Sequence, residues 1–386
     1  MNIVNENNKI YKYEMFWRKD KKKMTYDSNN VPFPWPKEVA SDKAKKWQNK
    51  EQFINKYIST TIDLIDNGKF NRYDKFKGCL LCDKKNVTTG YFKVNNIIWE
   101  DSLKHYVNKH NIKPSEDFID FIFRYVPRKN KQTRVIARVN GVDVVKHDKK
   151  YLKVDRNQIL IMDALMRHGK HKLYVDEKNK NVYRFSEHAG LLDFDNDGLN
   201  KILVFANTTR VDENDTDIFL PKNVPDAFDY EYMFHTHPPT PTPGARAIDG
   251  VLYEFPSLSD IFHFIDHYND GETQGSIVMT PEGMYIIRKN IQNDQDIMIN
   301  EDKFYKDTTS VYEKVQKDAI KKYGTKFEMD EFYEKIVQDS SYIDKVNKTL
   351  NKYQLHIDYY PRIKDHNGLY VVDTIYLPVY VIKYKK

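Results

Sequence analysis

The chain has 386 residues and a formal net charge of +6, and 40% of its residues are hydrophobic, which predicts two or three domains with sizeable cores. No apolar run approaches the roughly 20 residues that a membrane span needs, and the Lys-rich start from Met1 to Lys23 lacks the apolar region of a secretory signal. The two cysteines lie three positions apart, a spacing that suits a metal better than a disulfide, so we expect an intracellular, reducing compartment such as the cytoplasm or nucleus.

The first 50 residues carry the basic character of the chain. They contain 12 Lys and Arg against 6 Asp and Glu, a surplus equal to that of the whole chain. We interpret residues 1 to about 40 as an irregular, solvated arm, with an acidic partner or nucleic acid as the alternative. Prolines make 32–36 extended, and Ser41 would cap a helix to about Ile65. Residues 1–75 thus form a basic arm and a helix.

A second segment, 76–127, has the spacing of a metal site. Cys79, Cys82, His105 and His110 follow the pattern C-x2-C-x22-H-x4-H. The pattern resembles the zinc-finger class with two Cys and two His, except that the central spacing is longer. A hairpin inserted at 87–98 would account for the difference. The resemblance implies one structural Zn²⁺, and the alternative is a chance pair of thiols near unrelated histidines.

The same segment does not have the residues of a base-reading finger. If His105 is the seventh helix position, the base-reading positions become Ile98, Asp101 and Lys104. These offer no Arg or Asn for a purine edge, and there is no tandem finger. We therefore expect a structural or protein-binding finger, and no sequence-specific binding of nucleic acid.

The third segment, 130–295, alternates strands with helices. Asn140-Gly141 predicts a hairpin within 134–145, a helix follows at about 155–167, and strands follow at 182–192, 202–207 and 229–237. A helix from Asp260 to about Tyr268 precedes two further strands at 276–279 and 284–288. Residues 296–386 read as helices to about 355 and then strands, which predicts a separate α+β domain of unknown role.

The chemistry of the third segment centres on His235 and His237, at the end of an apolar run. Residues two apart in a strand point to the same side, so both imidazoles can reach one metal. Asp260, at the start of a helix, would be a third ligand. Three protein ligands leave one position open, which is typical of catalytic zinc and not of structural zinc.

A zinc hydrolase also needs a base for its water and a donor for the oxyanion. Glu187 is the candidate base, because it lies on a strand upstream of the two histidines. Ser257 is the candidate donor, since it lies three residues before Asp260 on the turn into the helix. The alternative for Ser257 is a plain helix N-cap. His263 and His267 follow on one helix face, where an ordinary surface or core role competes with support of the metal ligands.

The order Glu, His-x-His-Pro and Ser-x-x-Asp resembles the JAMM zinc metalloprotease family, also called JAB or MPN-plus, over about 150–290. That family removes ubiquitin or ubiquitin-like tags by isopeptide hydrolysis. The resemblance implies an α/β/α core with a mixed sheet and one catalytic Zn²⁺. It also implies Glu187 as general base, Ser257 as transition-state stabiliser, and three zinc ligands: His235, His237 and Asp260.

One departure from the family pattern is the insertion from Pro238 to Pro256. It would be a lid, a substrate-choosing loop or an obstruction. The expected partners are ubiquitin-like conjugates, with other proteins binding the finger and the C-terminal domain, and no membrane. The alternative function is a non-catalytic MPN-fold interaction or structural protein. The excess of Lys, Asn, Ile and Tyr over Ala and Gly indicates an AT-rich genome. Such a protein would suit a large DNA virus, its virion or its factory, or a protist.

Overall fold

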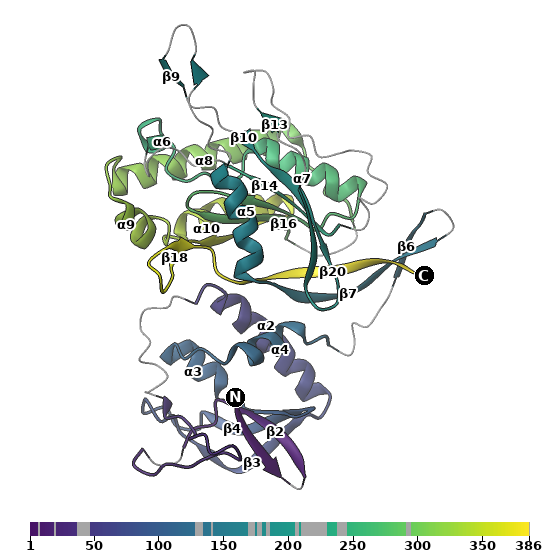
Figure 1. Cartoon of the computed structure of the whole chain (residues 1–386), viewed down its shortest axis with the longest axis vertical. Coiled ribbons are helices and arrows are strands. Elements are labelled where there is room, and N and C mark those ends of the chain that lie inside the picture. The colour runs from purple at the N-terminus through teal and green to yellow at the C-terminus, as the bar shows by residue number, and fades with distance from the viewer. Residues whose placement is uncertain are drawn as a thin grey trace. The chain divides into compact units, whose positions relative to one another are not determined.

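Two compact units make up the chain, Met1–Lys131 and Gln132–Lys386 (Figure 1). Both contain helices and sheets, which confirms the predicted α+β class. The computed structural model describes residues 1–6, 8–18, 21–36, 47–127, 134–139, 142–168, 174–175, 180–182, 186–204, 208–209, 230–237, 245–290 and 295–385. None of the helices in these ranges has the length and apolarity of a membrane span.

The first unit is a mixed five-stranded sheet with helices on one face. The strand order is β1 (Asn2–Glu6), β2 (Lys9–Glu14), β5 (Ile97–Glu100), β4 (Thr88–Val94) and β3 (Phe70–Lys77). Helices α2 (Lys50–Asp66) and α4 (Glu116–Arg124) pack against it, and α3 (Leu103–His110) follows β5. Aromatic rings fill the interface, with Trp99 5.3 Å from Phe92 and 5.2 Å from Phe118 between ring centroids. The hairpin β4–β5 is the insertion predicted within the finger spacing.

Two sequence predictions for this unit are wrong. The arm is not irregular throughout, because β1 and β2 pair with each other and β2 pairs with β5. The division at 75/76 also fails, since β3 crosses it and pairs with β4. Short polar strands such as β1 carry a weak periodic signal, and pairing within the sheet decides their structure. The helix α2 begins at Lys50, and the predicted cap Ser41 lies outside the described residues.

The second unit is built on a mixed six-stranded sheet. Its order is β12 (Leu199–Val204), β11 (Ala189–Phe194), β14 (Tyr232–Thr236), β15 (Gly275–Met279), β16 (Gly283–Lys289) and β17 (Leu355–Pro361). Only the β14–β15 pair is parallel among these pairings, and helix α7 (Leu258–Asp270) connects the two strands. Gly190 lets β11 and β14 approach closely, because a Cβ there would lie 2.3 Å from the Phe234 ring.

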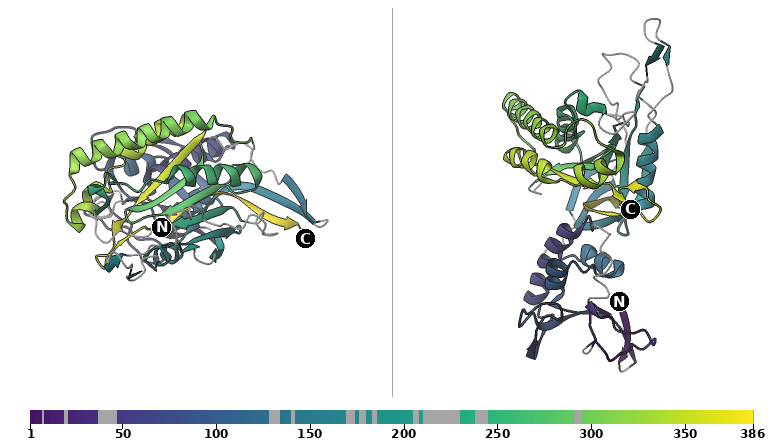
Figure 2. Two further views of the ribbon diagram at one scale, coloured as in Figure 1. Left: turned by 90° about the horizontal axis from the view of Figure 1, so that it is seen from above. Right: turned by 90° about the vertical axis from the view of Figure 1, so that its left-hand side faces the viewer.

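Helices cover both faces of this sheet, and Figure 2 shows the sheet between them. On one face α5 (Arg156–His168) packs with a three-stranded sheet of β6 (Arg134–Val139), β7 (Val142–Val154) and β20 (Ile375–Lys385). On the other face lie α7, α8 (Glu301–Tyr323) and α10 (Ser341–Leu350). The remaining elements are short: β8 (Tyr174–Val175), β9 (Lys180–Val182), β10 (Ser186–Glu187), β13 (Thr208–Thr209), α6 (Ala245–Ile248), α9 (Met329–Glu331), η3 (Phe332–Ile336), η4 (Asn351–Tyr353), β18 (Ile363–Lys364) and β19 (Tyr370–Val371).

The predicted boundary at 295/296 is corrected by strand pairing. Strand β17 pairs with β16 over seven residues and completes the central sheet. Strand β20 pairs with β7, which precedes the whole core in sequence. The C-terminal segment is therefore part of the second unit. Without β17, the edge of the central sheet at β16 would be unpaired.

A buried ion pair links the start and end of this unit. The Arg362 guanidinium donates two hydrogen bonds to Asp163 of α5, at 2.8 and 2.5 Å, and both side chains are at most 3% exposed. It also donates to the carbonyl oxygens of Thr280 and Pro281 at 2.9 and 2.7 Å. Both charges of the Asp163–Arg362 pair, and most of the guanidinium N–H groups, thus have partners inside the protein, as a buried pair requires.

We expect Arg362→Met to destabilise the second unit by about 3–5 kcal/mol, because it leaves the buried Asp163 carboxylate with only the largely exposed Arg167, 3.7 Å away, as a counter-ion. The measurement is urea unfolding followed by far-UV circular dichroism. All four tryptophans (17, 35, 47 and 99) belong to the first unit, so the tryptophan fluorescence transition serves as an internal control that should not move. The double variant Asp163→Leu/Arg362→Met should recover most of the loss. Equal destabilisation by both variants would show that the charge pairing is unimportant.

Candidate metal centres and catalytic site

The two predicted histidine ligands lie at the carboxyl end of β14. All five residues of this strand are buried, because β11 and β15 flank it and helices cover both faces. His235 is 5% exposed, and the backbone N–H of His237 donates to the Met279 carbonyl at 2.8 Å. The Nε2 atoms of His235 and His237 lie 3.3 Å apart. Both imidazoles therefore point to one place, as the strand period predicted.

Asp260 reaches the same place from the first turn of α7. Ser257 is the N-cap, and its Oγ accepts the Asp260 N–H at 3.1 Å. In return the Asp260 carboxylate accepts the Ser257 N–H at 2.6 Å, which completes a capping box. The same carboxylate lies 3.2 Å from the Nε2 of His235 and 3.5 Å from that of His237. The capping box thus fixes the rotamer of the third predicted ligand.

The three donor atoms have the spacing of metal ligands. Zinc binds imidazole nitrogen at about 2.0–2.1 Å, so a tetrahedral site has donor separations of roughly 3.3–3.4 Å. The separations here, 3.2 to 3.5 Å, agree with that geometry. Burial alone would raise the pKa of Asp260, but the two histidines hold it well below its usual range. The carboxylate is therefore ready to bind a cation, and the three side chains form a possible metal site.

Glu187, the predicted base, precedes the strand that pairs with β14. Ala189 on β11 is opposite His235 on β14. The next pair continues the register, since the Thr236 N–H donates to the His188 carbonyl at 2.9 Å and the His188 N–H donates to Thr236 Oγ1 at 3.0 Å. A continuation of this register by one pair would bring Glu187 opposite His237, on the face of the two histidines. Glu187 itself belongs to β10, which pairs with β13, so its role as the base stays a prediction.

The position of Ser257 fits both predicted roles, that of a helix N-cap and that of a hydrogen-bond donor to an oxyanion. It is the N-cap of α7 and is exposed. The capping bond uses Oγ as an acceptor, so the hydroxyl hydrogen is not consumed by it. An N-cap serine next to the ligand Asp260 can therefore also donate a hydrogen bond to a bound group.

Tyr312 of α8 is a contributor that the sequence analysis missed. Its hydroxyl donates to the carbonyl of Pro256, the residue before Ser257, at 2.9 Å. Burial and the nearby Asp260 carboxylate raise the pKa of Tyr312. It fixes the entry into α7 from a helix more than fifty residues downstream, and no local pattern in the sequence could indicate this.

The insertion between His237 and Ser257 is anchored where the structure describes it. Its first part, 238–244, lies outside the described residues, so a lid there stays a prediction. In the second part, Leu252 and Tyr253 are buried in the core. Their backbone N–H groups both donate to Gln316 Oε1 of α8, at 2.8 and 3.1 Å. Residues 252–256 are therefore core, packed on the C-terminal helices.

The helix face after Asp260 carries a histidine pair. His263 and His267 lie with their Nε2 atoms 3.1 Å apart. Neither belongs to the possible metal-binding group of His235, His237 and Asp260. Support of the ligands by His263 or His267 stays a prediction.

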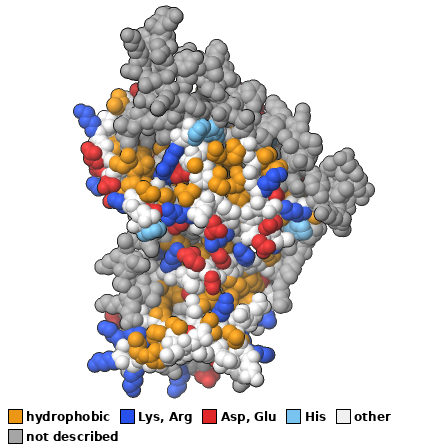
Figure 3. All heavy atoms as spheres, viewed as in Figure 1, with side chains coloured by type: hydrophobic (Ala, Val, Ile, Leu, Met, Phe, Trp, Pro, Cys, Tyr) orange, Lys and Arg blue, Asp and Glu red, His pale blue; other side chains and the backbone are white. Residues whose placement is uncertain are grey.

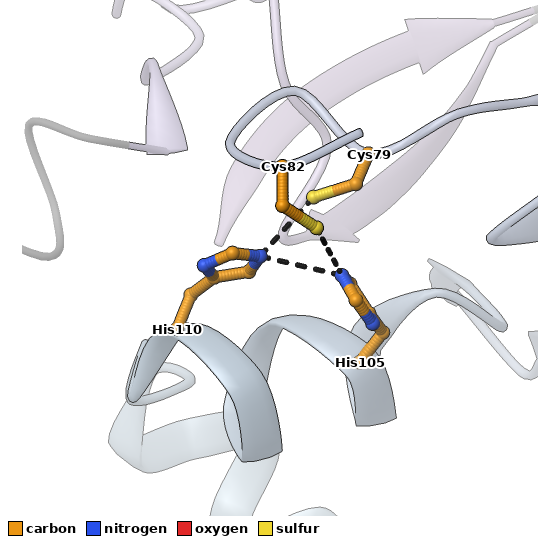
Figure 4. Close-up of side chains that lie close together, drawn as sticks. All are labelled: Cys79, Cys82, His105 and His110. Atoms are coloured by element: carbon orange, nitrogen blue, oxygen red, sulfur yellow. Dashed lines mark hydrogen bonds between the residues drawn. The ribbon is translucent and has the colours of Figure 1, made fainter. Parts of the chain in front are cut away.

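The predicted Cys2His2 site is assembled in the first unit (Figure 4). Cys79 Sγ lies 3.2 Å from His110 Nε2, Cys82 Sγ lies 3.5 Å from His105 Nε2, and the two Nε2 atoms are 3.3 Å apart. The cysteines come from the loop between β3 and β4, and the histidines from α3. The Tyr106 hydroxyl of α3 accepts the Leu80 N–H at 3.0 Å and so holds the loop against the helix.

The surroundings of this second cluster favour metal binding over base reading. Burial, the His110 ring and then Lys84 and Lys109 lower the pKa of His105, and burial followed by Lys109 lowers the pKa of His110. Neutral imidazole is the form that binds metals. Of the positions considered for base contacts, Ile98 is buried and Asp101 accepts hydrogen bonds from Thr89. Neither is available to read a base.

Comparisons with known proteins identify a viral relative. "Uncharacterized protein R413" of Acanthamoeba polyphaga mimivirus is 32% identical over 343 residues, which cover 87% of this chain and 92% of the relative. The chain belongs to the family of this mimivirus protein. No family model and no solved structure matches the chain. Because the match of 343 residues is longer than either unit, the similarity includes parts of both.

We expect each cluster to bind one divalent metal ion independently. His235→Ala should halve the metal content measured by mass spectrometry, because it removes one of three ligands. Cys82→Ser should also halve it, and should in addition lower the midpoint of the tryptophan fluorescence transition, since all four tryptophans belong to the first unit. His366→Ala, on a turn outside both clusters, is the matched control. Unchanged metal content in either ligand variant would rule out that site.

Proposed function

We propose that the second unit is a zinc-dependent isopeptidase that hydrolyses ubiquitin or ubiquitin-like conjugates. The observation that carries the proposal is the convergence of two histidines, at the end of β14, with Asp260 from α7. Glu187, two residues before β11, is the expected base. Ser257 caps the same helix. This combination supports the resemblance to the JAMM zinc metalloproteases, in which the same five residue types form the active site.

Zinc is the metal that best suits both clusters. Two histidines and one carboxylate are a ligand set of catalytic zinc with one open position, whereas two cysteines and two histidines are a closed, structural set. We therefore assign one catalytic and one structural Zn²⁺. When bound, the catalytic zinc would activate a water as nucleophile and polarise the scissile carbonyl.

The side chains of the chain itself would carry the protons of the reaction. Glu187 accepts a proton from the attacking water as its oxygen bonds to the carbonyl carbon. The Ser257 hydroxyl donates a hydrogen bond to the developing oxyanion. The carbon–nitrogen bond then breaks, and Glu187 returns the proton to the leaving lysine amine. The products are a free carboxylate on the tag and a free amine on the substrate, so protons and atoms balance.

We expect Glu187→Gln to abolish cleavage of ubiquitin or ubiquitin-like conjugates while zinc content and folding stay at the parent level. Glutamine keeps the shape of glutamate but cannot accept the proton, and removal of a general base lowers rates by about 10²–10⁴-fold. The assay is gel separation of a panel of conjugates with zinc-loaded protein, with and without a chelator. Glu313→Gln on the solvent side of α8 is the matched control, since the Glu313 side chain is 61% exposed.

Two results would contradict the proposal. Parent-level cleavage by Glu187→Gln would remove the assigned mechanism. A parent protein that binds two zinc ions and cleaves no conjugate in the panel would instead support the alternative function, a non-catalytic interaction or structural protein of a virus.

A further inference from the structure

The first unit carries a row of tyrosines on one face of its sheet. Trp99 and Phe92 face α2 and α4, so residues of alternate parity lie on the opposite, outer face. Register places Tyr13 opposite Ile98 and Tyr91 opposite Glu100 on that face. Tyr73 of the edge strand joins them, with its ring centroid 5.5 Å from that of Tyr91. This tyrosine row, Tyr11, Tyr13, Tyr73 and Tyr91, thus extends across β2, β4 and β3, and each member is only partly buried.

Lysines accompany the tyrosine row. The Lys93 ammonium lies 4.0 Å from the centre of the Tyr11 ring, and that of Lys77 lies 4.4 Å from the centre of the Tyr73 ring. The Lys77 side chain is 51% exposed and pairs with the Glu100 carboxylate, which also accepts a hydrogen bond from the Tyr73 hydroxyl. Figure 3 shows further Lys and Arg side chains along the margin of the first unit. Two of the four rings, those of Tyr11 and Tyr73, therefore have a lysine ammonium beside them.

The charge of the whole unit has the same sign. Residues 1–131 contain 27 Lys and Arg against 16 Asp and Glu, a net charge of +11, which leaves −5 for residues 132–386. The basic surplus is therefore not confined to the first 50 residues. It is spread over a folded unit, where it can act on a bound polyanion.

A cavity continues the tyrosine row at its β1–β2 end. Its volume is about 340 Å³, and it is lined by four aromatic side chains together with Val4, Ser28 and the carboxylates of Glu6 and Asp27; the aromatic ones are Tyr13, Phe16, Tyr26 and Phe33. The ring centroids of Tyr13 and Phe16 lie 4.6 Å apart at an angle of 82°. Tyr26 is 53% exposed. An open hollow of this size with aromatic walls can hold a planar ring.

We propose that the outer face of this sheet binds single-stranded nucleic acid. Aromatic rings in a row offer stacking platforms for successive bases, and lysines between them contact the phosphates. A duplex would hide its base faces from the rings, so unpaired strands are the preferred ligand. Ile98 is buried and Asp101 bonds to Thr89, so the exposed Lys104 is what remains of the three positions considered for base contacts, and we expect binding to be independent of sequence. This inference does not depend on the proposed isopeptidase activity.

The test is fluorescence anisotropy with the full zinc-loaded chain and labelled oligonucleotides of about 20 nucleotides, a length that exceeds the usual site of one stacking platform. One arm uses oligo-dT, one uses oligo-U, and one uses a duplex of equal length. We expect both single strands to bind more tightly than the duplex. Affinity should fall steeply between about 50 and 200 mM salt, because phosphate contacts release counterions.

Variants separate stacking from charge. Tyr73→Ala/Tyr91→Ala should weaken single-strand binding by at least about tenfold, since each stacked base contributes measurably. Tyr73→Phe/Tyr91→Phe should bind almost like the parent, because phenylalanine keeps the ring. Tyr305→Ala, which removes a tyrosine that is 57% exposed on α8, is the matched control and should change nothing. Tryptophan fluorescence verifies that the first unit stays folded in each variant.

Three results would overturn the proposal. The parent could fail to bind either single strand at low salt. It could bind the duplex as tightly as the single strands, with the alanine double variant unaffected, which would assign the affinity to charge alone. Or the phenylalanine variant could lose as much affinity as the alanine variant, which would exclude stacking as the cause.

Discussion

The register between β11 and β14 is the constraint on which the candidate active site depends. It puts Ala189 opposite His235 and continues through His188 and Thr236, and an extension by one pair would bring Glu187 opposite His237. A slip of one residue would turn that extension to the other face of the sheet. Gly190 protects this register, since any side chain there would collide with the Phe234 ring and the Leu203 carbonyl.

The second requirement is the position of α7, and the C-terminal segment supplies it. The capping box orients Asp260, but a cap only fixes a side chain relative to its own helix. Tyr312 holds the carbonyl of Pro256 and Gln316 holds the backbone of residues 252 and 253. The long insertion and the appended helices are thus packed together, and neither can be understood as an independent addition to the core.

The two units differ in how they are stabilised. The second unit has a central sheet covered on both faces and a buried Asp163–Arg362 pair that joins distant parts of the chain. The first unit is half that length, and small units bury a smaller fraction of their surface. A structural metal between the β3–β4 loop and α3 would offset this, because its binding free energy contributes to folding. The net charge of +11 on this unit destabilises its folded state, since like charges repel one another. A bound structural metal would oppose that repulsion.

The local sequence determined the elements and the ligand types. The His-x-His pair on an apolar strand, the Ser-x-x-Asp helix start and the Cys-x-x-Cys turn were all predictable, because strand period, capping and turn geometry act over a few residues. The hairpin within the finger spacing followed from the excess length of that spacing. Strands β1 and β2 escaped detection because they are polar, and their structure depends on partners far along the chain.

Only the tertiary structure decided how these parts join. It made the C-terminal segment part of the second unit through β17 and β20, placed Tyr312 and Gln316 beside the start of α7, and aligned tyrosines from three strands on one face. Each of these contacts joins residues that are far apart in sequence, so no periodicity along the chain encodes them. The sequence alone determined which side chains could bind metal, and long-range strand pairing and helix packing decided which of them meet.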